Sequence, residues 1–205
     1  MKKLNLIIEK LRIPISRIFA FILLAFLAVS HSGWEQTDSI MGSLFFLVGV
    51  LFVAVASMGR MWCSLYIAGY KTEVLITEGP YSMSRNPLYF FSFIGAIGVG
   101  FASKTILIPL VLCIVFMMYY PFVINSEENE LQRLHAEKYE EYVRTTPKFF
   151  PKISHLKEPK KYTVNPIVFK THLYSAVWFI WLVGILAFIE KLHELNVIPV
   201  FFKIY

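Results

Sequence analysis

Residues 74–89 read VLITEGPYSMSRNPLY, a polar and turn-rich stretch that lies between two strongly apolar parts of the chain. Gly79-Pro80 is typical of a tight turn, because proline fixes one backbone dihedral angle and glycine tolerates angles that other residues avoid. Asn86-Pro87 is typical of a helix start, because asparagine is a favoured N-cap and proline is favoured at the first helical position. The stretch therefore predicts a turn followed by the start of an apolar helix.

The chain around this stretch is too apolar for a soluble domain of its size. Of its 205 residues, 57% are hydrophobic and only 17% are charged, and the mean hydropathy is +0.58. A helix needs roughly 20 mainly apolar residues to span a bilayer. The candidate spans are 13–30, 39–57, 88–102, 105–124 and 172–189, of which the third is short and rich in glycine. We therefore expect an all-α polytopic membrane protein with about five transmembrane helices in a single domain over residues 1–205.

Basic residues predict the orientation of these helices. The N-terminus carries five of them, of which four precede residue 13 and the fifth is Arg17, whereas the short loop after the first span has Glu35 and Asp38 and no basic residue. Because loops rich in Lys and Arg stay in the cytoplasm, we expect a cytoplasmic N-terminus. The stretches 58–87 and 125–171 are also basic and are expected on the same side, with the C-terminus outside. The net charge of +6 then fits anionic membrane lipids as partners rather than nucleic acid, since the basic residues flank apolar segments.

A second polar stretch, 125–151, follows two further apolar segments. From Ser126 the pattern becomes amphipathic, which predicts a helix lying along the membrane surface. The apolar stripe of this helix comprises Leu131, Leu134, Tyr139 and Tyr142. One interpretation of Glu127 and Glu128 is a capping box with Asn125 that only starts the helix. The other is that these paired carboxylates, which are costly at an anionic membrane face, meet a cationic or hydroxyl-bearing ligand.

Arg85 precedes the predicted helix start at Asn86-Pro87, where free backbone N–H groups carry partial positive charge. Together they predict a site for a carboxylate or a phosphate. The alternative is that Arg85 only anchors the helix at the cytoplasmic face, with Tyr81 and Tyr89 as interfacial aromatic residues. The histidines and cysteines show no metal-ligand spacing, so we expect no metal site.

The two polar stretches together resemble the isoprenylcysteine carboxyl methyltransferase and phospholipid methyltransferase superfamily of membrane enzymes. The first motif of this superfamily has the form L-V-T-x-G-P-Y-x-x-x-R-H-P-x-Y, which residues 75–89 match with Asn86 in place of the His. Asparagine does not titrate near neutral pH, so we expect no general base at this position. The second motif begins with a Glu pair and ends in a Pro, and its matches are Glu127, Glu128, Leu131, Tyr139, Tyr142 and Pro147. The matched core spans about 74–151, and an extra C-terminal helix at about 172–190 follows it.

The resemblance implies an integral membrane methyltransferase that uses S-adenosyl-L-methionine, bound at the cytoplasmic face between the motifs. It implies a lipidic or membrane-associated acceptor that is isoprenylcysteine carboxylate-like or phospholipid-like. In the cofactor site so implied, Arg85, Asn86 and Pro87 suit the methionine carboxylate. The other expected contacts are Glu127 and Glu128 for the amino group or ribose hydroxyls, and Leu75, Ile76, Tyr81, Tyr89 and Leu131 for the adenine and the sulfonium side.

Arg85 and Glu127 are the candidate catalytic residues. Arg85 can orient a carboxylate acceptor, whereas Glu127 or Glu128 can take a proton from an amine acceptor. Which acceptor is used, and the oligomeric state, do not follow from the sequence.

Two other functions remain open on these residues. Sterol and steroid reductases carry a related Arg-His-Pro-Asn-Tyr motif and use NADPH. Against this class, Leu88 stands where the Asn would be, and no acidic residue follows Tyr89 closely. A non-enzymatic membrane protein that binds a lipid or a partner is the second alternative.

Overall fold

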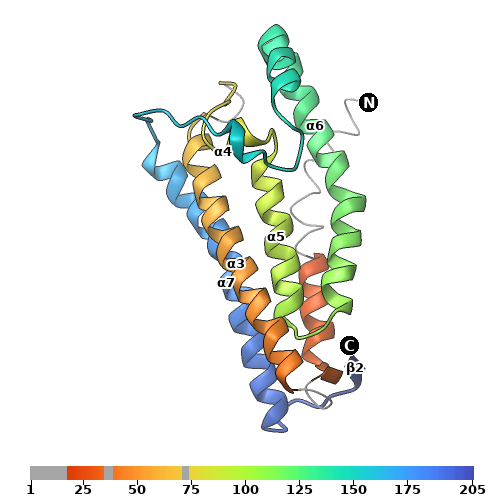
Figure 1. The fold of residues 1–205 in the computed structure, drawn as a ribbon. Helices are drawn as coiled ribbons and strands as arrows, with labels where there is room; N and C mark the ends of the chain where they lie inside the picture. The colour runs from red at the N-terminus through yellow and green to blue at the C-terminus, as the bar shows by residue number, and fades with distance from the viewer. Residues whose placement is uncertain (1–17, 35–38, 71–73) are drawn as a thin grey trace. The chain divides into compact units, whose positions relative to one another are not determined.

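The computed structural model describes residues 18–34, 39–70 and 74–205 (Figure 1). Its helices are Ile18–Ala28, α3 (Ser39–Ile67), α4 (Pro80–Met83), α5 (Pro87–Ala102), α6 (Leu107–Thr145), the 3-10 helix η1 (Ile153–His155) and α7 (Pro166–Glu194). Two three-residue strands, β1 (Ser30–Ser32) and β2 (Phe202–Ile204), pair in parallel. The all-α fold class predicted from the sequence is confirmed, with this small strand pair as an addition.

Three of the described helices are long and apolar enough to cross a membrane, namely α3, α6 and α7. The helix Ile18–Ala28 and the 16-residue α5 are also apolar but shorter than the roughly 20 residues of a full span. Large apolar side chains on the long helices are exposed, as expected for a surface that faces lipid. Part of the first predicted span, the basic N-terminal segment and the residues Glu35 and Asp38 lie outside the described residues.

The chain forms two compact units, and α3, α5, α6 and α7 each contribute one end to each unit. The first unit comprises Met1–Val53, Ala96–Val123 and Phe179–Tyr205. In it Gly49 lets α3 and α5 approach closely. A Cβ atom added to Gly49 would lie only 2.6 Å from the carbonyl oxygen of Gly98. The buried core of this unit comprises Leu27, Val53, Val99, Ala102, Ile108, Leu182, Leu186 and Ile204.

The C-terminal tail belongs to the first unit. Residues 197–205 are apolar but too short to span a membrane. In this tail β2 pairs with β1, and the backbone N–H of Leu107 donates to the carbonyl oxygen of Tyr205 at 3.0 Å. The Tyr205 ring also packs edge-on against Trp34, with ring centroids 5.8 Å apart. Backbone pairing therefore holds the tail in place.

The second unit, Ala54–Gly95 and Ile124–Trp178, contains both polar stretches. The predicted turn is confirmed, since Gly79 has φ 57° and precedes the single helical turn α4. A Cβ atom at Gly79 would lie 2.2 Å from the ring of Tyr66, so only glycine fits there. Helix α5 begins at Pro87, as predicted.

The structure corrects the prediction that a separate helix begins in the second polar stretch. Ser126 is not a helix start, because it lies buried inside α6, and the capping-box interpretation of Asn125 and Glu128 is therefore wrong. The helix changes direction ten residues later, at Ala136, which has φ 41° and ψ −115°. No separate interfacial helix begins at Ser126, because backbone hydrogen bonding continues through the switch from apolar to polar side chains. Of the predicted apolar stripe, Tyr139 and Tyr142 are buried, whereas Leu134 is exposed.

Candidate functional site

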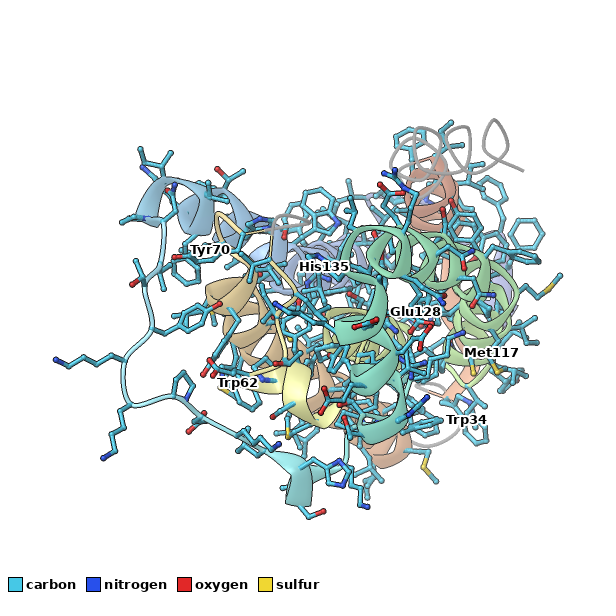
Figure 2. The ribbon with its side chains drawn as sticks, turned by 90° about the horizontal axis from the view of Figure 1, so that it is seen from above. Trp34, Trp62, Tyr70, Met117, Glu128 and His135 are labelled. Carbon is cyan, nitrogen blue, oxygen red and sulfur yellow. The ribbon has the colours of Figure 1, made fainter. Side chains whose placement is uncertain are left out.

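Glu128 joins the two polar stretches within the second unit. Its Oε1 accepts hydrogen bonds from Nε of Arg85 at 3.0 Å and from Nδ2 of Asn86 at 2.8 Å. Nζ of Lys148 lies 3.5 Å from Oε2. The Arg85 and Glu128 side chains are only 11% and 14% exposed, so solvent screens their ion pair weakly. The anion site predicted at the start of α5 thus contains a carboxylate of the chain itself, on α6 (Figure 2).

Arg85 also binds the C-terminal end of α6. Its Nη1 donates to the carbonyl oxygens of Val143 at 3.1 Å and Thr146 at 3.2 Å, and its backbone N–H donates to Pro147 at 2.9 Å. Carbonyl groups at a helix C-terminus carry partial negative charge, which favours a cation there. Arg85 therefore connects the end of α6 to the segment that precedes α5.

Asn86 occupies the predicted N-cap position, but its side chain has another role. Its carbonyl oxygen accepts the first helical bond, from the N–H of Phe90 at 3.2 Å. Its side-chain amide donates to Glu128 and, at 3.0 Å, to the carbonyl oxygen of Lys148. The helix boundary is therefore confirmed, with Pro87 fully buried as the first helical residue, whereas the side-chain amide nitrogen serves to cross-link the two stretches.

Glu127, the neighbour of Glu128, faces a different partner. The hydroxyl of Tyr89 donates to its Oε1 at 2.8 Å. Burial raises the pKa of Tyr81 well above its ordinary value, and the nearby Cys63, Tyr142, Glu127 and Tyr89 raise it further. The Tyr81 hydroxyl therefore stays neutral at physiological pH and is no candidate for a base.

The structure adds residues that sequence reasoning missed. Lys148 donates to Oδ1 of Asn125 at 2.5 Å, and the buried Ser84 donates to the carbonyl oxygen of Phe149 at 2.9 Å. The segment after α6 runs back along α4 (Figure 1), where Gly79 N–H donates to the carbonyl oxygen of Lys157 at 2.8 Å. These contacts join residues far apart in the chain, and no local pattern signals them.

The remaining predicted cofactor residues are half-buried. Leu75 and Ile76 lie in the irregular segment before Gly79, and Leu131 lies one helical turn after Glu127 on the same face of α6. Their contact with an adenine ring stays a prediction. Among the residues that the structure describes, no group of three His, Cys, Asp or Glu side chains is arranged to hold a metal ion.

Comparison with known proteins identifies the family of the chain that carries this site. Residues 37–138 match the model of a family described as phospholipid methyltransferase. This chain belongs to the phospholipid methyltransferase family. The resemblance inferred from the two motifs is confirmed, because this family belongs to the superfamily of isoprenylcysteine carboxyl methyltransferase-like membrane enzymes. The matched residues include Arg85, Asn86, Glu127 and Glu128.

Two relatives of this family member are similar over most of their length. The nickel-cobalt-cadmium resistance protein NccN of Alcaligenes xylosoxydans xylosoxydans is 36% identical over 190 residues, which cover 93% of this chain and 88% of NccN. The cobalt-zinc-cadmium resistance protein CzcN of Cupriavidus metallidurans is 35% identical over 187 residues, which cover 91% of this chain and 85% of CzcN. No solved structure matches the chain.

Proposed function

We propose that this member of the phospholipid methyltransferase family is an S-adenosyl-L-methionine-dependent enzyme that methylates a lipidic or membrane-associated acceptor at the cytoplasmic membrane face. The observation that carries the proposal is the convergence of both motifs in one unit, where Glu128 binds Arg85 and Asn86 while Glu127 binds Tyr89. Membership of a methyltransferase family supports the reaction class. The basic residues of both stretches support the cytoplasmic side.

The side chains at the candidate site match the chemical groups of the proposed cofactor. Glu127 suits an ammonium group or ribose hydroxyls, and the Tyr89 hydroxyl holds its carboxylate in one direction. Arg85 uses Nε and Nη1 within the protein, which leaves Nη2 for a ligand carboxylate. The rings of Tyr81 and Tyr89 suit a sulfonium cation. When bound, S-adenosyl-L-methionine supplies a methyl group on a positively charged sulfur.

The residues of the chain position the reactants and, when the acceptor is an amine, take up one proton. Methyl transfer in line with the sulfur needs the acceptor atom close, aligned and away from water. A carboxylate or thiolate acceptor needs no base, whereas an amine acceptor must lose a proton, which Glu127 can take. Glu128 is engaged by Arg85, Asn86 and Lys148, so its proposed role is to position the first two of these side chains.

The names of the relatives point to a physiological setting. NccN is named as a resistance protein for nickel, cobalt and cadmium, and CzcN as one for cobalt, zinc and cadmium. Amines, carboxylates and thiolates are the groups that bind such metals, and methylation of a carboxylate or thiolate removes its negative charge. The proposed function therefore includes a contribution to metal resistance through the modification of metal-binding groups at the membrane.

Calorimetry on the detergent-purified protein tests the proposal. We expect S-adenosyl-L-methionine and S-adenosylhomocysteine to bind and NADPH not to bind. Glu127→Gln should weaken binding of both adenosyl compounds at least tenfold, because a neutral amide attracts an ammonium group less. The matched control is Glu130→Gln, one turn away on α6, whose carboxylate is exposed and paired with Arg133.

Wild-type protein that is folded and binds neither adenosyl compound would contradict the proposal, and binding of NADPH would favour the reductase class instead. Mass spectrometry of a native lipid extract after incubation with labelled cofactor then identifies the acceptor. A labelled lipid amine, carboxylate or thiol distinguishes the three acceptor chemistries.

A further inference from the structure

Tyr139 carries a buried hydroxyl that no residue described in the structure satisfies. The residue is 3% exposed, and its hydroxyl has no hydrogen-bond partner among the described residues. Tyr142, three residues later on α6, is also buried, but its hydroxyl donates to the carbonyl oxygen of Tyr81 at 2.6 Å. Buried polar groups in native proteins are nearly always paired, so an unpaired one needs an explanation. Tyr142 therefore cross-links the unit, whereas the Tyr139 hydroxyl can donate to a ligand.

The surroundings of Tyr139 connect it to the candidate site. Its ring packs edge-on against Tyr142, with centroids 6.2 Å apart, and the charges of Glu128 and Arg85 both act on its hydroxyl. Tyr139 also lines a surface hollow of about 230 Å³. The other residues of this hollow are Gln132, Glu140, Val143 and Arg144. Val143, which lines the hollow with Tyr139, accepts a hydrogen bond from Arg85 through its carbonyl oxygen, so the hollow lies close to Arg85.

The break in α6 places Tyr139 in this position. Ala136, three residues earlier, has φ 41°, a conformation that costs energy for any residue with a Cβ atom. The residues that line the hollow lie on both sides of this break. Strained backbone of this kind persists only where the surrounding structure enforces it, and it is concentrated at functional sites.

Arg85 offers a second donor next to Tyr139. A guanidinium group has five N–H donors. In Arg85, Nε binds Glu128 and Nη1 binds the two carbonyl oxygens at the end of α6. Nη2 donates to no other residue that the structure describes. A ligand that satisfies both Nη2 and the Tyr139 hydroxyl must present an acceptor oxygen, and beside a guanidinium an anionic oxygen is favoured.

We propose that Tyr139 is a ligand-binding residue whose hydroxyl, together with Nη2 of Arg85, donates to an anionic oxygen of the methyl donor or the methyl acceptor. The inference rests on the proposed methyltransferase function and adds a residue to its site. A carboxylate of the donor and a carboxylate or phosphate of the acceptor share this chemistry. The experiment distinguishes these two sources.

The test is Tyr139→Phe, with Tyr142→Phe as the matched variant on the same helix. Tyr139→Phe should leave the thermal unfolding temperature unchanged or raise it, because its hydroxyl has no bond to lose. Tyr142→Phe should lower that temperature, because the bond to Tyr81 is lost. Calorimetry then measures binding of S-adenosylhomocysteine and of 5′-methylthioadenosine, which lacks the amino-acid carboxylate.

If the oxygen belongs to the donor, Tyr139→Phe weakens binding of S-adenosylhomocysteine at least tenfold and leaves binding of 5′-methylthioadenosine as in the wild type. If it belongs to the acceptor, binding of S-adenosylhomocysteine is unchanged, and half-saturation by a native lipid extract, measured by transfer of labelled methyl groups, needs at least fivefold more lipid. Wild-type values in both assays overturn this inference alone. Wild-type protein that binds no S-adenosylhomocysteine overturns the proposed function, and this inference with it.

Discussion

At the residue scale, the adjacent carboxylates Glu127 and Glu128 have different partners. Successive residues of a helix point about 100° apart, so the two side chains leave α6 in different directions. Glu128 is engaged by three donors, from Arg85, Asn86 and Lys148, whereas Glu127 binds the neutral hydroxyl of Tyr89. Glu128 therefore holds the two polar stretches together, whereas Glu127 contacts α5 through Tyr89.

The Arg85–Glu128 pair makes a prediction for stability. Glu128→Leu leaves the mostly buried Arg85 without its carboxylate, and the loss of one partner of a buried pair costs roughly 3–5 kcal/mol. The double variant Arg85→Met with Glu128→Leu should recover much of this loss, because no buried charge is left unpaired and Lys148, which also faces Glu128, is 47% exposed, although it should not bind the cofactor. The measurement is thermal and denaturant unfolding in detergent.

The control for this pair lies on the same helix. Glu130 pairs with Arg133, but their side chains are 44% and 60% exposed, so Glu130→Leu should change stability little. An equal loss of stability in Glu128→Leu and Glu130→Leu would show that the Arg85–Glu128 pair does not hold the unit together.

At the element scale, the ends of the helices were only partly predictable. The start of α5 followed from Asn86-Pro87, because helix-start preferences are local. The course of α6 through Ser126 was not predicted from the sequence. The switch from apolar to polar side chains there resembles a helix start, although the helical backbone continues. The break at Ala136 had no sequence signal, since neither proline nor glycine occupies that position.

The turn before α4 makes a prediction at this scale. Gly79→Ala should destabilise the protein by roughly 1–2 kcal/mol through its left-handed backbone and further through the overlap of the new Cβ atom with the Tyr66 ring. Gly184→Ala in α7 is the matched control, because nothing lies within 4 Å of its new Cβ atom and alanine favours a helix. We expect a lower unfolding temperature for the first variant and an equal or higher one for the second. Equal effects would mean that the turn does not require glycine.

At the scale of the whole molecule, the long apolar helices α3, α6 and α7 establish a polytopic membrane protein. The basic residues of the segments 58–87 and 125–171 predict that both polar stretches lie in the cytoplasm. The proposed cofactor is soluble, so a cytoplasmic site is also what the proposed function requires.

Cysteine labelling tests this orientation. In a chain with Cys63 and Cys113 replaced by alanine, Lys160→Cys lies before α7 and Val197→Cys lies after it. On intact cells an impermeant maleimide should label Val197→Cys, whereas Lys160→Cys should react only after permeabilisation. The reverse pattern would contradict the predicted orientation, and equal labelling would show that α7 does not cross the membrane.

By itself, the sequence determined the helical membrane class, the glycine turn, the start of α5 and the family. These features depend on composition and on neighbouring residues, so the local pattern is sufficient to specify them. Only the tertiary structure decided that Glu128 neutralises Arg85 across 43 residues of chain and that Lys148 joins them. It also decided that the Tyr139 hydroxyl has no partner within residues 18–34, 39–70 and 74–205. The reason is physical. The partners of buried charges and hydroxyls depend on how α5, α6 and the segment after α6 pack together, and neighbouring residues in the sequence do not specify this packing.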